Sequence, residues 1–195
     1  MNINLIGPLK SDLSEVNSHD FTIFVDGGLN FKDGFNNYIS VGDSDSTSLK
    51  HDIQLDPVKD ESDYFHALKQ IPPKTKNIFA HGLYGGRLDH QLFILGETET
   101  ILIKNNFNFF FFHDNNLRIL AFSKGKHEFS AHGNFSLFSF TDQKILLTGD
   151  CKYKITGFDS KIPKLSSRGL SNIGHGKVEL SCESPIFVLF PQEEI

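Results

Sequence analysis

The sequence has no tryptophan, one methionine and two cysteines among its 195 residues. Cys151 and Cys182 lack the spacing of a metal site, and we expect two buried free thiols rather than a disulfide. The longest run rich in apolar residues, Phe107–Phe112, is far shorter than the roughly 20 residues that cross a bilayer. The first residues have no charged segment followed by a long apolar run, so no signal peptide is expected. These absences predict a soluble, cytoplasmic protein.

Positive charge is also scarce, with 19 Lys and Arg against 24 Asp and Glu and a formal net charge of -5. This balance argues against nucleic acid or an anionic membrane as the main partner. A protein of this charge that binds polyphosphate needs cations between its own acids and the phosphates. Phenylalanine is abundant, with 20 residues, and the length is sufficient for one large or two small domains with a real core.

Short apolar runs alternate with helix-like segments up to about residue 113. Several runs are apolar at consecutive positions, as in strands buried on both faces of a mostly parallel sheet. The predicted strands are Asn4–Ile6, Phe21–Val25, Tyr38–Val41, Asn77–Ala80 and Phe107–Phe112. We therefore expect residues 1–114 to form an α/β domain, with helices flanking the sheet.

Two helices are expected in this first half. One covers Asp60–Gln70, with Asp60 as the candidate N-cap. The other covers Leu88–Lys104, and an apolar stripe is predicted along it. The leucines of this stripe are Leu88, Leu92, Leu95 and Leu102.

From about residue 115 the pattern changes to short strands separated by turn residues. The predicted strands are Leu117–Phe122, His127–Ala131, Asn134–Phe140, Lys144–Leu147, Lys152–Ile155, Lys177–Ser181 and Ile186–Phe190. Seven short strands without a convincing helix favour an all-β sandwich over residues 115–195.

Carboxylates follow or flank the predicted elements of the first half. They are Asp26 in VDGG, Asp43 and Asp45 in VGDSDST, Asp60 and Asp63 in VKDESD, and Asp89 in GLYGGRLDH. In open α/β sheets, ligands bind beyond the carboxyl ends of the strands, so these acids are expected to converge. Each acid alone is compatible with a turn or a helix cap, but several together repel one another unless a cation neutralises them. Magnesium, which bridges carboxylates and phosphates, is the expected cofactor.

Arg87 stands beside Gly85–Gly86, where backbone amides can approach an anion and the guanidinium can grip phosphate oxygens. A surface ion pair with Asp63 or Asp89 is an equally good interpretation of Arg87. The sequence contains neither a GxxxxGK[ST] loop nor a GxGxxG after a strand, which disfavours P-loop and dinucleotide-binding folds. These residues predict magnesium and phosphate but name no substrate.

Five blocks in order, VDGG (25–28), GDSDS (42–46), KDESD (59–63), GGRLDH (85–90) and GLSN (169–172), resemble thiamine pyrophosphokinase. The resemblance runs through nearly the whole chain. It implies an N-terminal α/β domain that binds ATP and magnesium, a C-terminal β-sandwich that binds thiamine and dimerises, and an active site completed across a homodimer interface. The implied reaction transfers a diphosphate from ATP to the thiamine hydroxyl and releases AMP.

The resemblance also implies roles for individual residues. The magnesium and diphosphate positions are Asp26, Asp43, Asp45 and Asp63; the ATP positions are Asp26, Gly27, Arg87 and His90; the thiamine positions are Tyr153, Ser171 and Asn172. The implied catalytic set is Asp43, Asp45, Asp63, Arg87 and Asp89, with Asp63 or Asp89 as general base. Tyr153 is expected to stack on thiamine from the partner subunit, since an aromatic face suits a delocalised cation.

Three positions depart from the family pattern. Ser44 replaces an apolar residue between two of the acids, Ile94 stands near the place of an Asn, and Tyr153 stands where Trp is usual. Two other functions stay open. One is a related diphosphokinase for another hydroxymethyl heterocycle such as a pterin, which GLSN and Tyr153 disfavour; the other is a non-catalytic thiamine- or nucleotide-binding sensor, which Ser44 and the QLFIL segment favour.

Overall fold

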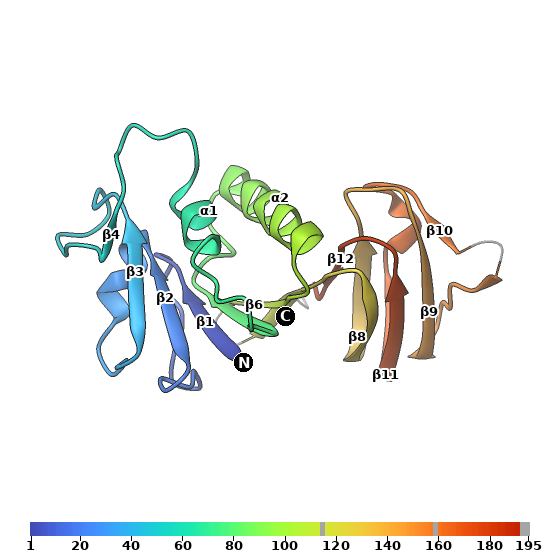
Figure 1. Ribbon diagram of the computed structural model, residues 1–195. Helices are drawn as coiled ribbons and strands as arrows, with labels where there is room; N and C mark the ends of the chain where they lie inside the picture. Colours follow the sequence, from blue (N-terminus) through green and yellow to red (C-terminus); the bar gives the residue numbers. More distant parts are fainter. Residues whose placement is uncertain (114–115, 158–159, 192–195) are drawn as a thin grey trace. The chain divides into compact units, whose positions relative to one another are not determined.

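The computed structural model describes residues 1–113, 116–157 and 160–191, and this part of the chain is mostly β-sheet with few helices (Figure 1). The chain divides into two compact units. The first contains residues 1–98 and 109–117, and the second contains residues 99–108 and 118–195. Both cysteines are free and buried, as the sequence predicts. Within the described residues, no helix is both long enough and apolar enough to cross a membrane.

The first unit contains a sheet in the order β6-β5-β1-β2-β3-β4. Its strands are β1 (Asn2–Ile6), β2 (Phe21–Val25), β3 (Tyr38–Gly42), β4 (Ile53–Gln54), β5 (Asn77–His81) and β6 (Asn108–His113). The pairs β1–β2, β1–β5, β2–β3 and β3–β4 are all parallel. The five predicted strands are confirmed. They could be recognised because strands buried on both faces are continuous apolar runs in the sequence, whereas the two-residue β4 is too short to give such a run.

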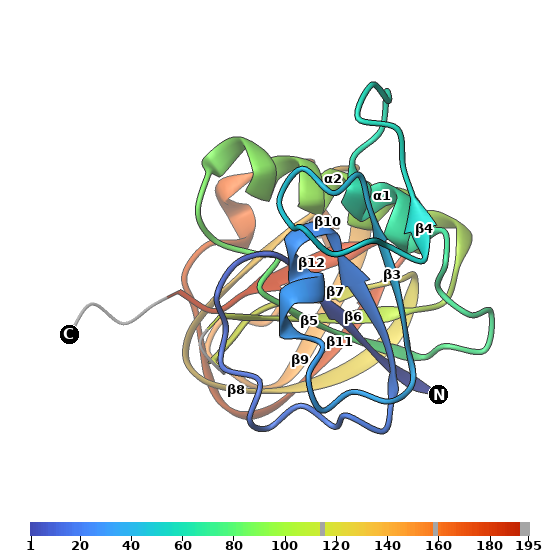
Figure 2. The ribbon, with the colours of Figure 1, turned by 90° about the vertical axis from the view of Figure 1, so that its left-hand side faces the viewer.

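The two faces of this sheet are covered differently. Ile3 and Leu5 of β1 are fully buried on one face, and α1 (Asp63–Leu68) packs beside β2 and β3 (Figures 1 and 2). On the other face, Ile6 packs with Phe24 and with Leu29 of the 3-10 helix η1 (Asp26–Phe31). Both faces of the central strands are therefore buried, although the second face also carries the buried polar side chains of Asn4, Thr22 and Ser40.

The start of α1 differs from the sequence prediction. The helix begins at Asp63, and Ser62 rather than Asp60 is its N-cap, since the Ser62 hydroxyl accepts a hydrogen bond from the Phe65 amide. Ser62 is extended, with φ -69° and ψ 156°, which places the residues before it outside the helix.

The second helix, α2, covers Leu88–Lys104 as predicted, but its buried stripe is rotated from the prediction. Leu95 and Leu102 are buried, whereas Leu88 and Leu92 are 70% and 57% exposed. Their place on the buried side is taken by Ile94 and by Thr98, whose hydroxyl bonds to Tyr64 of α1. The predicted stripe is wrong in its first two turns, where the residues that the structure describes leave Leu88 and Leu92 exposed.

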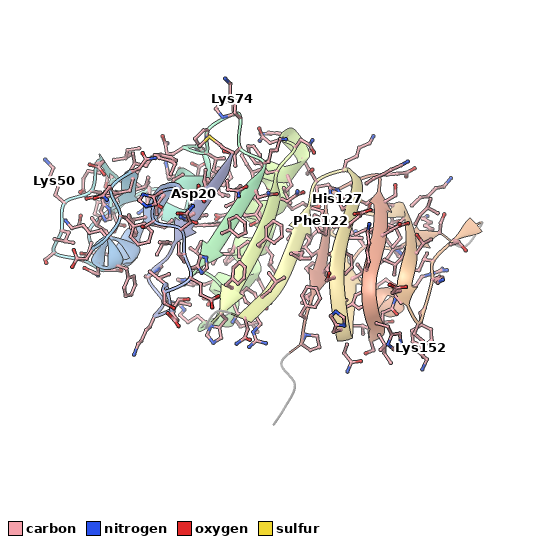
Figure 3. All side chains as sticks on the ribbon, turned by 90° about the horizontal axis from the view of Figure 1, so that it is seen from below. Asp20, Lys50, Lys74, Phe122, His127 and Lys152 are labelled. Atoms are coloured by element: carbon pink, nitrogen blue, oxygen red, sulfur yellow. The ribbon has the colours of Figure 1, made fainter. Side chains whose placement is uncertain are left out.

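The second unit is built from antiparallel pairs in the order β10-β9-β11-β8-β12-β7. The strands are β7 (Asn116–Phe122), β8 (Gly125–Phe138), β9 (Gln143–Cys151), β10 (Lys161–Ile162), β11 (Asn172–Cys182) and β12 (Ile186–Leu189), and a 3-10 helix, η3 (Ser167–Gly169), precedes β11. At the turn between β7 and β8, the His127 ring stacks on Phe122 with centroids 4.5 Å apart (Figure 3).

Two features predicted in this unit are wrong. The turn predicted between His127–Ala131 and Asn134–Phe140 is absent, because His132–Gly133 pairs with β11; both predicted strands fall in one continuous strand, β8, which ends at Phe138. Lys152–Ile155 is not a strand: the chain bends after β9, and only Ile155 forms an isolated bridge, with Leu147.

Candidate functional site

The carboxyl end of β2 carries the first acid of the site. Asp26 opens η1 directly after Val25 and has a positive φ of 50°, a conformation that costs energy for a residue with a side chain. Gly27 and Gly28 follow, and a Cβ on Gly28 would lie 2.2 Å from the Ile6 carbonyl oxygen, so the turn needs glycine there. The Oδ1 atom of Asp26 is buried and has no hydrogen-bond partner in the described residues.

The end of the neighbouring strand, β3, carries the next two acids. Asp43 Oδ1 accepts a hydrogen bond from the Asp45 amide at 3.1 Å, and Ser44 between them has φ 68°. The Ser44 hydroxyl donates a hydrogen bond to Gln54 Oε1 of β4, 3.1 Å distant. One carboxylate oxygen from each of Asp26, Asp43 and Asp45 lies within 4.8 Å of the others.

Lys59 was not singled out from the sequence, yet it joins two of the predicted acids. Its Nζ lies 2.5 Å from Asp43 Oδ2 and 2.8 Å from Asp63 Oδ1. The three side chains are only 16%, 9% and 14% exposed. The hydrogen bond from Lys59 lowers the pKa of Asp43, whereas burial raises the pKa of Asp63. The four-residue spacing of Lys59 and Asp63 was the available signal, although Lys59 lies before the helix begins.

His51 is a second residue that the sequence reasoning missed. It is 3% exposed, and neither ring nitrogen has a hydrogen-bond partner in the described part of the chain. A Cβ on Gly42 would lie 2.5 Å from His51 Nε2 and 2.9 Å from the Cα of Asp26. The imidazole therefore packs directly beneath the backbone that carries Asp26 and Asp43.

Arg87, Asp89 and His90 lie at the exposed start of α2, outside the group formed by Asp26, Asp43 and Asp45. Arg87 holds Asp89 with two hydrogen bonds, Nη2 to Oδ2 at 2.6 Å and Nε to Oδ1 at 3.1 Å, which is one of the two interpretations considered from the sequence. This contact lowers the pKa of Asp89 to about 2. The His90 amide donates to Asp89 Oδ1 at 3.0 Å. Ile94 is buried in α2 and serves the packing of the helix.

The three predicted thiamine residues lie together in the second unit. Asn172, at the start of β11, is 5% exposed, and its side chain clamps the backbone of Tyr153. Tyr153 N donates to Asn172 Oδ1 at 3.0 Å, and Asn172 Nδ2 donates to Tyr153 O at 2.7 Å. Ser171 has φ 58°, and its amide donates to Ser136 Oγ. The Tyr153 ring is 54% exposed, with Lys152 Nζ 5.1 Å from its centroid.

No protein-family model matches the sequence, and no curated protein matches it either. Solved structures do resemble it over nearly its whole length. Thiamine pyrophosphokinase from Bacillus subtilis superposes with a TM-score of 0.74 at 21% identity, covering 99% of this chain and 100% of that one. The thiamin pyrophosphokinase from Candida albicans superposes with a TM-score of 0.72 at 17% identity, covering 96% of this chain and 88% of that one. The thiamin pyrophosphokinase from Geobacillus thermodenitrificans superposes with a TM-score of 0.71 at 20% identity, covering 100% of this chain and 99% of that one. The chain therefore has the fold of the thiamine pyrophosphokinases.

Proposed function

We propose that this protein is a thiamine diphosphokinase, which transfers a diphosphate from ATP to the thiamine hydroxyl and releases AMP. The observation that carries the proposal is the group of three carboxylates at the ends of two adjacent parallel strands, β2 and β3. It occurs in a chain with the fold of known thiamine pyrophosphokinases. Three carboxylates so close together repel one another, and the one positive charge of Lys59, shared between Asp43 and Asp63, offsets only part of that repulsion.

The residues fit a hard divalent cation such as magnesium. Asp26, Asp43 and Asp45 offer oxygen ligands, and Asp26 Oδ1 is a buried acceptor with no partner in the described residues. We assign these three acids to the ion, with Asp63 placed next to them through Lys59. When bound, magnesium would neutralise charge on the phosphate oxygens during transfer.

The chain's own cations would hold the phosphates. Lys59 lies among the acids and can shift its ammonium toward a phosphate once a metal neutralises Asp43. Arg87, on the exposed start of α2, can exchange Asp89 for a phosphate oxygen pair without changing its geometry. With Asp26, Gly27 and His90, Arg87 makes up the ATP-binding set expected from the resemblance.

For the proton of the thiamine hydroxyl, the geometry favours Asp63 over Asp89. Asp63 shares Lys59 with Asp43 and so lies next to the carboxylate group, whereas Asp89 pairs with Arg87 at the start of α2, outside that group. A general base needs a free oxygen within reach of the hydroxyl. Asp63 therefore takes this role in the proposal.

Thiamine would stack on the exposed ring of Tyr153, beside Ser171. Because the side-chain amide of Asn172 forms two hydrogen bonds with the Tyr153 backbone, we assign it the role of positioning that ring. We propose that the ring serves the active site of a partner subunit in a homodimer. The apolar side chains left exposed on α2, Leu88, Leu92 and Phe93, support association of two chains. A sandwich arrangement of the second unit, domain boundaries near residue 115 and a cytoplasmic location remain part of this proposal.

The test is incubation of the purified protein with ATP, magnesium and thiamine, with chromatographic separation of nucleotides and thiamine esters. We expect AMP and thiamine diphosphate in equal amounts, and only with the metal. Asp43→Asn is expected to lower turnover at least ~100-fold, since a ligand that positions the reacting phosphates is lost. Asp33→Asn, an exposed acid outside the group, is the matched control.

The other outcomes are distinct. AMP formed with a hydroxymethylpterin but not with thiamine would keep the chemistry and change the substrate. Tight binding of thiamine or nucleotide without AMP would replace the enzyme by a sensor. Turnover of Asp43→Asn within a few-fold of wild type would contradict the assigned metal site.

A further inference from the structure

A cavity in the first unit shares no residue with the carboxylate group. It has a volume of about 350 Å³, and residues of β1, β5, β6 and the loop before β2 line it. None of its lining residues belongs to the group formed by Asp26, Asp43 and Asp45. Its volume falls within the range of small-molecule pockets.

Three aromatic side chains of β5 and β6, which we call the ring shelf, line this cavity: Phe79, His81 and Phe112. His81 and Phe112 are stacked with centroids 4.9 Å apart and planes 7° from parallel. Phe79 lies beside them, 6.3 Å from Phe112, and is itself stacked on Phe110 at 5.2 Å. These side chains belong to the sheet face opposite Ile3 and Leu5, since Asn4 pairs with Phe79 in the register of β1 and β5. Figure 3 looks onto this face, with Asp20 labelled.

His81 contributes a polar group that the protein does not use. The residue is 6% exposed, and its Nδ1 is buried without a hydrogen-bond partner in the described residues. It nevertheless lines the cavity, and it lies against Phe112 on one side. A buried imidazole nitrogen without a partner costs free energy, and a ligand that forms a hydrogen bond with it would recover that cost.

The loop before β2 forms the wall and is held in place. Asn4 Nδ2 donates to the Asn17 carbonyl at 3.0 Å and to Thr22 Oγ1 at 3.2 Å. Thr22 Oγ1 in turn donates to the Asp20 carbonyl at 3.2 Å. These bonds fix the wall before any ligand arrives, which lowers the entropic cost of binding.

The charge of the wall is entirely negative. Glu15 and Asp20 line the cavity, the lining includes no lysine or arginine, and neither carboxylate has an ion pair among the described residues. Flat aromatic faces attract delocalised cations, and unpaired carboxylates at the rim add to that attraction.

We propose that this cavity binds a planar aromatic cation, a nitrogen heterocycle of one or two rings, between the shelf of Phe79, His81 and Phe112 and the carboxylates of Glu15 and Asp20. The site is separate from the proposed catalytic centre and does not depend on it. Its occupant would be recognised by flatness and positive charge rather than by phosphate.

The probe is N-methylquinolinium, with quinoline at pH 8 as its neutral counterpart of nearly the same shape. Calorimetry should show that the wild type binds the cation and that it binds quinoline at least ~5-fold more weakly. The Glu15→Gln/Asp20→Asn double variant should lose a similar factor in its affinity for the cation. Both acids are on the surface loop, so the variant should remain folded. Asp33→Asn, which removes one surface carboxylate outside the cavity, should bind the probe like wild type.

The site is located by NMR of the histidine ring protons, with His81 assigned by comparison with His81→Gln. Stacking of the probe should move the His81 ring resonances upfield. Tyr153→Ala and Asp43→Asn should keep this binding, which separates its outcome from that of the proposed activity. Equal binding of quinoline, no effect of the double variant, or unchanged His81 resonances at saturation would each overturn the proposal.

Discussion

Replacing Lys59 by methionine tests whether its ammonium holds the acid group together in the absence of metal. In the wild type, Nζ lies 2.5 Å from Asp43 and 2.8 Å from Asp63, and all three side chains are largely buried. Exposed ion pairs contribute ~0–1 kcal/mol, and breaking a fully buried pair costs ~3–5 kcal/mol. The exposed fractions of 9–16% place this contact between these limits. We expect Lys59→Met to lower the free energy of unfolding by about 1–3 kcal/mol.

Magnesium should reverse much of this loss. The variant lacks the ammonium that competes with a metal for Asp43, so the ion should bind it more tightly and stabilise it more than wild type. The assay is urea unfolding followed by circular dichroism, with chelator and with about 10 mM magnesium, a concentration chosen to exceed common magnesium dissociation constants.

Lys50→Met is the matched control, because Lys50 is exposed and its substitution removes the same charge from the same unit (Figure 3). It should change the unfolding free energy by less than about 0.5 kcal/mol under both conditions. If Lys59→Met were as stable as wild type with chelator, or if magnesium left the difference unchanged, the assigned role of Lys59 would be refuted.

Three further predictions follow from single contacts. The Cβ of Gly42→Ala would lie 2.5 Å from His51 Nε2 and 2.9 Å from the Asp26 Cα, so the variant should be destabilised by about 1–3 kcal/mol. It should also lose Mn²⁺ binding, measured by electron paramagnetic resonance. Retained Mn²⁺ binding would contradict the close packing. Burial lowers the pKa of His81 from 6.5 to about 4. The His81 ring therefore binds a proton less readily in the folded state than in the unfolded state. The free energy of unfolding should be highest above pH 6.5 and should fall by up to roughly 3 kcal/mol as the pH is lowered toward 4. The free energy of unfolding of His81→Gln should fall less over this range, and parallel pH curves for the two proteins would refute the prediction. Asn172→Ala should weaken thiamine binding about tenfold in calorimetry, with ATP binding unchanged, because the two hydrogen bonds to the Tyr153 backbone are lost; unchanged thiamine affinity would exclude the positioning role.

The first half of the fold was predictable because its strands are buried on both faces and read as continuous apolar runs. The same rule failed for α2, where Leu88 and Leu92 fit an apolar stripe but are exposed. Periodicity identifies an apolar face without showing what covers it, so the exposed start of α2 was assigned to a core. In the second half, His132–Gly133 looked like a turn, and only pairing with β11 kept the chain extended through it.

The sequence by itself determined which acids follow which strands, because β2 and β3 are short apolar runs that each end at an aspartate. The tertiary structure decided which of these acids share a site. The parallel order of β1, β2 and β3 brings Asp26 beside Asp43 and Asp45, while Arg87 and Asp89 pair with each other on α2. Lys59 and the ring shelf around His81 also appear only in three dimensions. The physical reason is that a charge or a ring acts on its neighbours through space, and the sequence specifies spacing along the chain alone.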